Sequence, residues 1–157
     1  EVLELKHLGF MERQENVVFI GSPGVGKTHL AIALGVEACR QNKRTLFINC
    51  HELLIRLRTA YEKGTLERVL RRYARYELLI IDEIGYLPIQ RHEADLIFQL
   101  LNMRYETHST IFTTNISLSG WGELFRSPET AAAILDRMVH HVKIYKIKGK
   151  SYRMKQT

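Results

Sequence analysis

The sequence has 157 residues, enough for one domain with a substantial core, and its hydrophobic content of 45% is that of an ordinary globular protein. No apolar run is long enough to span a bilayer, and residues 1–10 do not resemble a signal peptide, which together predict a cytoplasmic protein with no membrane partner. The formal net charge of +6 favours an anionic partner.

Nothing in the sequence divides the chain into parts. There is no internal repeat, low-complexity tract or Pro/Gly-rich linker, so we expect residues 1–157 to form a single domain. The two cysteines, Cys39 and Cys50, lie in apolar contexts and lack the C-x-x-C spacing of a metal or redox site. We therefore predict that both are reduced thiols in the core.

A strand over residues 17–20, a glycine-rich loop over 21–28 and a helix over 30–39 are predicted at the start of the chain. The strand is apolar and β-branched, and the helix is apolar almost throughout, which indicates that both are buried. The loop reads GSPGVGKT and satisfies the pattern G-x-x-x-x-G-K-[ST] at every fixed position. A plain glycine turn is the alternative, but such a turn would not need the Lys-Thr pair. The stretch is therefore predicted to be a phosphate-binding loop.

The fixed positions of this loop have separate physical roles. Gly24 and Gly26 permit backbone angles that a side chain would forbid, so that N–H groups turn inward onto anionic oxygens. Lys27 brings a positive charge to the β- and γ-phosphates of ATP, and Thr28 offers a hydroxyl to Mg²⁺. The positive end of the following helix acts on the same site. We assign nucleotide binding to Gly21, Ser22, Pro23, Gly24, Val25, Gly26, Lys27, Thr28 and His29.

A second strand over residues 45–49 is followed by two predicted helices, over 51–61 and 65–76, with Gly64 between them. The second of these helices has an apolar stripe and, about 200° around its axis, a stripe of arginines. These are Arg68, Arg71, Arg72 and Arg75, which we call the arginine face. An ordinary solvated face is the alternative. Four arginines without an acid at each turn repel one another, which favours a face that binds DNA phosphates.

The third predicted strand, residues 78–82, is apolar up to Asp82, as in the centre of a parallel sheet. Four apolar residues followed by Asp-Glu form the Walker B pattern. Asp82 would help to hold Mg²⁺, and Glu83 would orient or deprotonate the water that attacks the γ-phosphate. The start of a surface turn is the alternative, which the phosphate loop upstream makes less favourable.

The rest of the chain continues the alternation of helices and strands. We predict a helix over 91–105, a strand over 110–114, a short helix or tight loop over 121–125, a helix over 130–140 and a last strand over 142–147, with Pro128 breaking the chain. This order predicts a parallel five-stranded α/β sheet flanked by helices. The phosphate loop would lie at the carboxyl edge of the sheet, where such sheets bind ligands. Residues 140–157 carry six Lys or Arg and no acid, which makes this tail a second DNA-binding candidate.

Two further residues are candidates for catalysis. Asn115 follows the fourth strand, where an amide can hold the attacking water, although an Asn in this position is more often a turn residue. Arg137, on the last helix, would reach the γ-phosphate of a neighbouring subunit and stabilise transition-state charge. An intrachain pair with Asp136 or another acid is the alternative for this arginine.

Together these motifs resemble those of AAA+ ATPases, and the extra helix after the second strand is similar to that of the initiator and helicase-loader clade, in which this region contacts DNA. The segments GSPGVGKTHLA, LLIIDEIGYLP, ADLIFQLLNMRYE, STIFTTN, AILDRMVHH and GKSYRM closely resemble the IstB-type helpers of bacterial insertion sequences. The resemblance covers nearly all of the chain.

The resemblance implies an ATPase that uses ATP and Mg²⁺, self-associates into an ATP-dependent oligomer on duplex DNA with weak sequence preference, and assists a transposase in target selection. It implies that Asn115 is sensor 1 and Arg137 the trans arginine. It also implies that the family's N-terminal region is missing and that no C-terminal helical lid fits, so that the chain alone would hydrolyse ATP weakly.

Two other functions are compatible with parts of this pattern. A DnaC-like helicase loader would share the ATPase chemistry but act on a replicative helicase and prefer single strands. A small-molecule kinase would need an arginine-rich lid after the core, and it would not need Asn115 or a trans arginine.

Overall fold

The computed structural model describes residues 2–139 and 142–148, and it has a parallel five-stranded sheet at its centre. The strands are β1 (Asn16–Ile20), β2 (Thr45–Asn49), β3 (Leu78–Ile84), β4 (Ser109–Thr114) and β5 (Val142–Lys146). Their order in the sheet is β2-β3-β4-β1-β5, and every neighbouring pair is parallel. The predicted α/β architecture is therefore confirmed.

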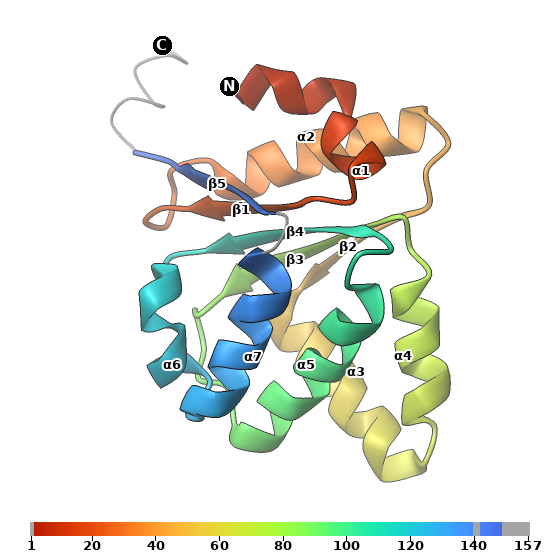
Figure 1. Ribbon diagram of the computed structural model, residues 1–157, viewed down its shortest axis with the longest axis vertical. Coiled ribbons are helices and arrows are strands. Elements are labelled where there is room, and N and C mark those ends of the chain that lie inside the picture. Colours follow the sequence, from red (N-terminus) through yellow and green to blue (C-terminus); the bar gives the residue numbers. More distant parts are fainter. Residues whose placement is uncertain (1, 140–141, 149–157) are drawn as a thin grey trace.

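Helices cover both faces of the sheet (Figure 1). One face carries the 3₁₀ helix η1 (Val2–His7) and the helices α1 (Gly9–Glu12) and α2 (Lys27–Arg40). The other carries α3 (Cys50–Lys63), α4 (Leu66–Ala74), α5 (Arg91–Arg104), α6 (Trp121–Leu124) and α7 (Pro128–Val139); the short 3₁₀ helix η2 (Leu118–Gly120) precedes α6. None of the helices in the described part of the chain is long and apolar enough to cross a membrane.

The central strands are apolar on both faces because each face meets a separate part of the core. In β1, Val17 and Phe19 belong to the cluster under α2, whereas Val18 belongs to the cluster under α3, α5 and α7. The residues of β3 alternate in the same way, and those of β4 are buried throughout. This two-sided burial explains why β1 and β3 are nearly continuous apolar runs and not alternating patterns.

Several predicted boundaries differ from the structure. Pro128 does not break the chain but starts α7, since the first residue of a helix needs no hydrogen-bonded N–H. The helix α4 ends at Ala74, so that Arg75 follows the helix and is not part of it. The predicted end of the last helix at His140 lies outside the described residues, as do residues 149–157 of the predicted basic tail. Cys39 is exposed on α2, which contradicts its prediction as a core thiol, while Cys50 is buried as predicted.

Candidate nucleotide-binding site

The loop between β1 and α2 needs glycine at three places. Gly24 and Gly26 have φ angles of 82° and 101°, which side-chain-bearing residues rarely adopt. At Gly21 the obstacle is contact, because a Cβ there would lie 2.5 Å from the carbonyl oxygen of Ile147 and 2.9 Å from Val25 Cγ2. Gly26 also caps the start of α2, so the positive end of this helix faces the loop.

Lys27 is folded back onto this loop. Its side chain is 4% exposed, and Nζ donates hydrogen bonds to the carbonyl oxygens of Gly21 at 2.6 Å and Ser22 at 2.9 Å. Burial lowers the pKa of Lys27, while the nearby carboxylates of Asp82 and Glu83 raise it. The loop therefore holds an ammonium group at the place where phosphate would bind.

Thr28 and Asp82 are brought together across the sheet edge. Thr28 Oγ1 donates to the two Asp82 carboxylate oxygens at 3.0 and 3.2 Å, and Asp82 is 4% exposed. The hydroxyl of Thr113 on β4 also donates to Asp82 Oδ1. Hydroxyl and carboxylate oxygens are the donors that Mg²⁺ takes, usually with several waters, so Thr28 and Asp82 fit this ion.

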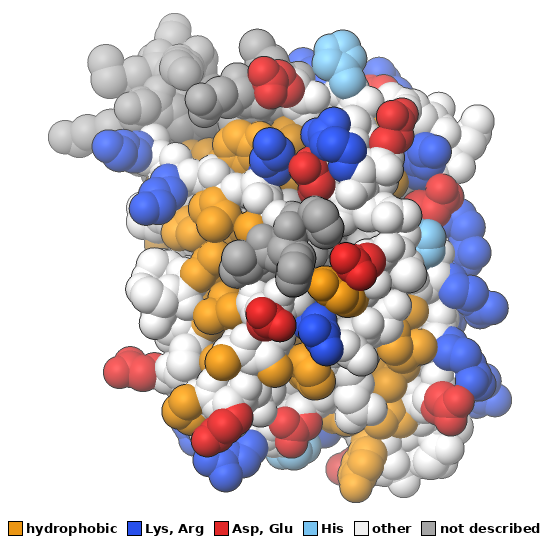
Figure 2. Space-filling model, viewed as in Figure 1, with side chains coloured by type: hydrophobic (Ala, Val, Ile, Leu, Met, Phe, Trp, Pro, Cys, Tyr) orange, Lys and Arg blue, Asp and Glu red, His pale blue; other side chains and the backbone are white. Residues whose placement is uncertain are grey.

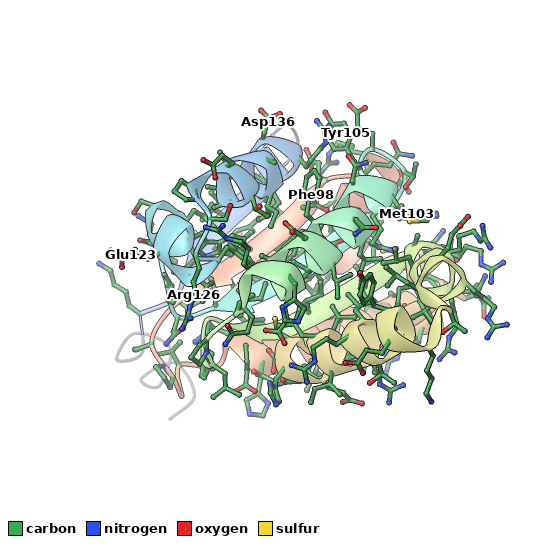
Figure 3. The ribbon with its side chains drawn as sticks, turned by 90° about the horizontal axis from the view of Figure 1, so that it is seen from below. Phe98, Met103, Tyr105, Glu123, Arg126 and Asp136 are labelled. Atoms are coloured by element: carbon green, nitrogen blue, oxygen red, sulfur yellow. The ribbon has the colours of Figure 1, made fainter. Side chains whose placement is uncertain are left out.

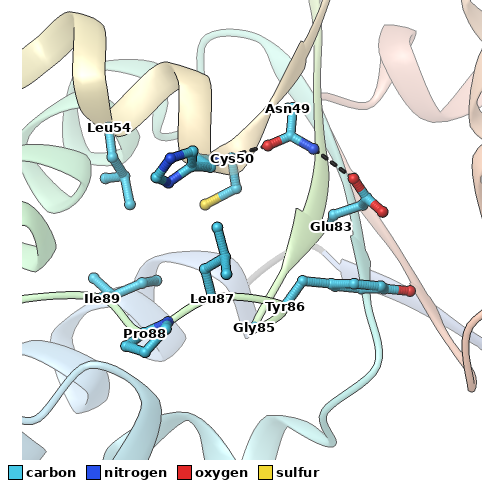
Figure 4. Close-up of a pocket in the computed structure, with 10 residues that line it drawn as sticks. Asn49, Cys50, Leu54, Glu83, Gly85, Tyr86, Leu87, Pro88 and Ile89 are labelled. Atoms are coloured by element: carbon cyan, nitrogen blue, oxygen red, sulfur yellow. Dashed lines mark hydrogen bonds between the residues drawn. The ribbon is translucent and has the colours of Figure 1, made fainter.

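Glu83 has a strained backbone and a restrained carboxylate. Its φ angle of 65° lies in the left-handed region, beside an irregularity in the β3–β4 ladder between Ile81 and Ile84. The Glu83 N–H donates to Thr113 Oγ1 at 2.8 Å. Its Oε1 accepts a hydrogen bond from Asn49 Nδ2 at 2.5 Å (Figure 4).

Asn49 was not among the residues singled out from the sequence. A signal was available, because Asn49 is a polar residue that ends β2, and β2 lies next to β3 with Asn49 in register with Asp82. Its Oδ1 also accepts a hydrogen bond from the His51 N–H, and through this bond the Asn49 side chain caps the start of α3. Sequence spacing alone did not reveal that β2 and β3 are neighbours.

Asn115 lies at the same edge of the sheet as Asp82 and Glu83. It directly follows β4 and is exposed. A Cβ on Gly85 would come within 3.1 Å of Asn115 Oδ1, so the turn after Glu83 passes close to this amide. The structure therefore gathers Lys27, Thr28, Asp82, Glu83 and Asn115 near one edge of the sheet, where ligands of open α/β folds bind.

The sequence model of the IstB-like ATP binding protein family matches residues 1–157. The chain belongs to this family. It is 52% identical over 155 residues to the "Insertion sequence IS232 putative ATP-binding protein" of Bacillus thuringiensis subsp. berliner, and 51% identical over 155 residues to the corresponding IS21 protein of Pseudomonas aeruginosa. These matches cover 99% of this chain but 62% and 58% of the relatives, so this IstB-like chain spans about three fifths of their length.

Solved structures similar to the IstB-like chain include a helicase loader and a replication initiator. The crystal structure of the DnaC helicase loader matches with a TM-score of 0.78 and 26% identity over 94% of this chain and 86% of that one. DnaI matches with a TM-score of 0.80 and 21% identity, covering 94% and 83% of the two chains. DnaA bound to AMPPCP and single-stranded DNA matches with a TM-score of 0.79 and 19% identity, covering 99% and 48%. The predicted AAA+ fold is confirmed.

Arg137 of the IstB-like chain lies away from its own phosphate loop. Its Nε donates to Asn102 Oδ1 at 2.9 Å, and its guanidinium is 5.0 Å from the centre of the Tyr105 ring and 3.7 Å from Asp136 Oδ2. It shares a small pocket with Asn16 and Thr110, which lie at the amino ends of β1 and β4. Figure 3 shows Tyr105 and Asp136 far from Glu123 and Arg126, which precede α7.

The arginine face of the IstB-like chain is exposed on and just after α4. Figure 2 shows Lys and Arg side chains gathered along the edge of the molecule where α4 lies in Figure 1. The expectation that these arginines lack acids is wrong for Arg71, which pairs with Glu67 at 2.6 Å one helical turn earlier. Within the described residues, the other three form no ion pair, and Arg72 lies 5.8 Å from the Tyr73 ring centre.

Proposed function

We propose that residues 1–157 form a single AAA+ ATPase domain of a cytoplasmic insertion-sequence helper. This protein binds ATP with Mg²⁺, assembles on duplex DNA with weak sequence preference, and assists a transposase in target selection and transposition. The relatives' names support the first part of the proposal, because they describe insertion-sequence ATP-binding proteins. The observation that carries the ATPase assignment is the Thr28–Asp82 contact beside the lysine-bearing loop.

Each site residue would have a separate role in phosphoryl transfer. Lys27 would leave the loop carbonyls and meet the β- and γ-phosphates, while Thr28 and Asp82 would hold Mg²⁺, which offsets phosphate charge when bound. Glu83 would take or orient the proton of the attacking water, and Asn115 would hold that water in line with the γ-phosphate. Nucleotide contacts are assigned to the whole loop from Gly21 to His29.

Arg137 supports an assembly in which subunits complete one another's sites. Arg137 lies near the amino ends of β1 and β4, whereas the phosphate loop follows the carboxyl end of β1. This position favours contact with the nucleotide of a neighbouring subunit over contact with its own. A second copy packed against this end would receive the guanidinium at its γ-phosphate, where an arginine can raise the rate by about 10³–10⁵. Asn102 and Asp136 hold the side chain at the surface in this structure.

Exposure of the arginine face supports DNA binding. Arg68, Arg72 and Arg75 have no ion pair among the described residues and are free to meet phosphates, while Arg71 would first have to leave Glu67. Phosphate contacts neutralise charge without reading bases, which gives the weak sequence preference that a target-selecting helper needs.

A DnaC-like helicase loader remains the second candidate, because the DnaC helicase loader is similar over most of both chains. The two functions differ in their DNA: a transposition helper would bind duplex more tightly, and a loader would bind single strands more tightly. Titration of the purified protein with fluorescent duplex and single strands of one sequence, in the presence of a non-hydrolysable ATP analogue, measures this preference. Tighter binding to single strands would favour the loader.

The ATPase assignment is tested with two variants at the site. Lys27→Ala should lose most of its affinity for a fluorescent ATP analogue, since no other described cation is placed by the loop to meet the phosphates. Glu83→Gln keeps the shape of the side chain and should bind ATP but not hydrolyse it. Glu67→Gln, an exposed change on α4, serves as the control and should do both. Full affinity in Lys27→Ala would show that the loop is not the nucleotide site.

A further inference from the structure

Tyr86 lies beside the loop lysine, although it is neither in the phosphate loop nor in the Walker B pair. Its ring centre is 5.8 Å from Lys27 Nζ, within the range of a cation–π contact. The two carbonyl oxygens that accept hydrogen bonds from Nζ belong to Gly21 and Ser22. Lys27 is therefore held between loop carbonyls and an aromatic ring.

The backbone of the β3–α5 connection fixes where this ring lies. Gly85 has a φ angle of 97°, and a Cβ on it would come within 2.7 Å of Ile116 Cδ1, so the turn is pressed against the segment that follows β4. The Tyr86 N–H reaches back to the carbonyl oxygen of Glu83 at 3.5 Å. In Figure 4, the Tyr86 and Glu83 side chains extend toward the same side, away from Leu54 and Ile89.

The electrostatic surroundings agree with this placement. Burial raises the pKa of Tyr86, and the carboxylates of Glu83 and Asp82 raise it further. The phenol is thus close enough to the Walker B carboxylates to be affected by both, and it stays neutral at physiological pH. A neutral ring beside Lys27 adds no charge that would repel a phosphate.

We propose that Tyr86 is a positioning residue that forms the wall of the γ-phosphate site, holds Lys27 through its aromatic face, and makes the site prefer nucleoside triphosphates over diphosphates. The inference rests on the proposed nucleotide binding. The loop N–H groups surround the inner phosphates, Lys27 meets the β- and γ-phosphates, and Glu83 marks the γ end of the chain of phosphates. Tyr86 lies at this outer end, so its ring borders the γ-phosphate and not the part of the ligand that ADP shares with ATP.

Fluorescence titrations of the purified protein with a non-hydrolysable ATP analogue and with ADP test the proposal without a turnover measurement. Tyr86→Ala should weaken binding of the ATP analogue by about threefold to tenfold, the range of one partly buried cation–π contact, and should weaken ADP binding much less. Tyr86→Phe keeps the ring and should retain the parent's preference. Leu87→Ala changes the next residue of the same turn, which is 51% exposed, and serves as the matched control.

Each outcome bears on the proposal. Equal loss of both nucleotides in Tyr86→Ala, no loss of either, or a Tyr86→Phe variant as impaired as Tyr86→Ala would overturn it. Circular dichroism and thermal melting of each variant identify a change in folding, and Tyr86→Phe, which alters one hydroxyl, keeps the test valid if Tyr86→Ala does not fold.

Lys27→Ala separates the role of Tyr86 from the proposed function. If Lys27→Ala binds nucleotide normally, the proposed function fails. Weakened binding in Lys27→Ala with unchanged binding in Tyr86→Ala refutes only the role of Tyr86.

Discussion

Asn49 connects Glu83 on β3 to the start of α3, because the nitrogen and the oxygen of its side-chain amide have different partners. Nδ2 donates to Glu83 Oε1 at 2.5 Å, and Oδ1 accepts from the His51 N–H at 2.9 Å at the start of α3. The same side chain thus caps a helix and holds the carboxylate proposed to act on water. This hydrogen bond directs Oε1 of Glu83 toward β2, and we expect it to limit the use of the carboxylate as a base.

The first prediction separates these two roles of Asn49. Asn49→Ser keeps a good capping residue for α3 but is too short to reach Glu83, so we expect a higher rate of ATP hydrolysis with little change in stability. Asn49→Ala also loses the cap and should unfold about 1 kcal/mol more easily. Phosphate release and urea unfolding measure the two effects. If hydrolysis by Asn49→Ser stays at or below the parent's rate, Asn49 does not restrain Glu83.

The second prediction concerns DNA. Arg68→Ala with Arg72→Ala should weaken duplex binding on all sequences alike and flatten the slope of log K against log salt, by about one unit for each phosphate that the variant no longer binds. Nucleotide affinity should stay near the parent's. Anisotropy titrations on two unrelated duplexes at several salt concentrations measure both quantities.

A matched control for this double variant exists on the other face of the sheet. Lys6→Ala with Arg40→Ala removes the same charge from the exposed surface of η1 and α2. If both double variants lose the same affinity, only net charge matters. If neither changes the salt slope, the arginine face is a solvated surface, and the basic tail of residues 140–157 becomes the next candidate.

The third prediction tests whether Arg137 acts between subunits. Arg137→Ala and Lys27→Ala should each abolish most hydrolysis alone, but a mixture should recover part of it at interfaces that combine an intact loop with an intact arginine. Steady-state ATPase assays over a range of mixing ratios measure the recovery. An absence of recovery in mixed assemblies verified by cross-linking would support an intrachain role with Asn102 and Asp136.

The fourth prediction concerns Arg104, which is 2% exposed. Its guanidinium donates to the carbonyl oxygens of Tyr73, Ala74, Tyr76 and Ser109 and to Thr110 Oγ1, and so ties the end of α4 to α5 and β4. Arg104→Lys should lower the free energy of unfolding by about 2–4 kcal/mol, since an ammonium group cannot reach all five acceptors. Urea denaturation measures this decrease, and the exposed Arg40→Lys should change stability by less than about 0.5 kcal/mol.

The fifth prediction concerns the cysteines. Burial raises the pKa of Cys50 to about 12, so at pH 8 iodoacetamide should modify the exposed Cys39 and leave Cys50 unmodified until the protein unfolds. When the pH is above 9.0, the ordinary pKa of a thiol, Cys50 keeps its proton in the folded state but loses it in the unfolded state. The free energy of unfolding should therefore fall as the pH rises from about 9 toward 12, and Cys50→Ala should remove this part of the fall. Peptide mass mapping and unfolding at several pH values measure both effects.

Local patterns in the sequence were sufficient for the elements and the fold class. The apolar run of β1 predicted a buried strand and that of β3 a central parallel strand, since strands buried on both faces have no polar side. The loop from Gly21 to Thr28 and the pair Asp82–Glu83 were predicted as site residues because phosphate and Mg²⁺ binding requires certain residue types at short spacings along the chain. The segments shared with IstB-type proteins predicted the family, which the match over residues 1–157 confirmed.

Contacts between distant segments were decided only by the tertiary structure. Asn49 holds Glu83 because β2 and β3 are neighbours in the sheet, a pairing that no spacing in the sequence states. Tyr86 meets Lys27 because the turn after β3 packs against the segment after β4. No pattern in the sequence distinguishes Arg104 from the other arginines, but in the structure it is buried between α4, α5 and β4. Side-chain direction depends on how elements pack, so hydrogen bonds between residues about 30 or more positions apart follow from the fold and not from local pattern.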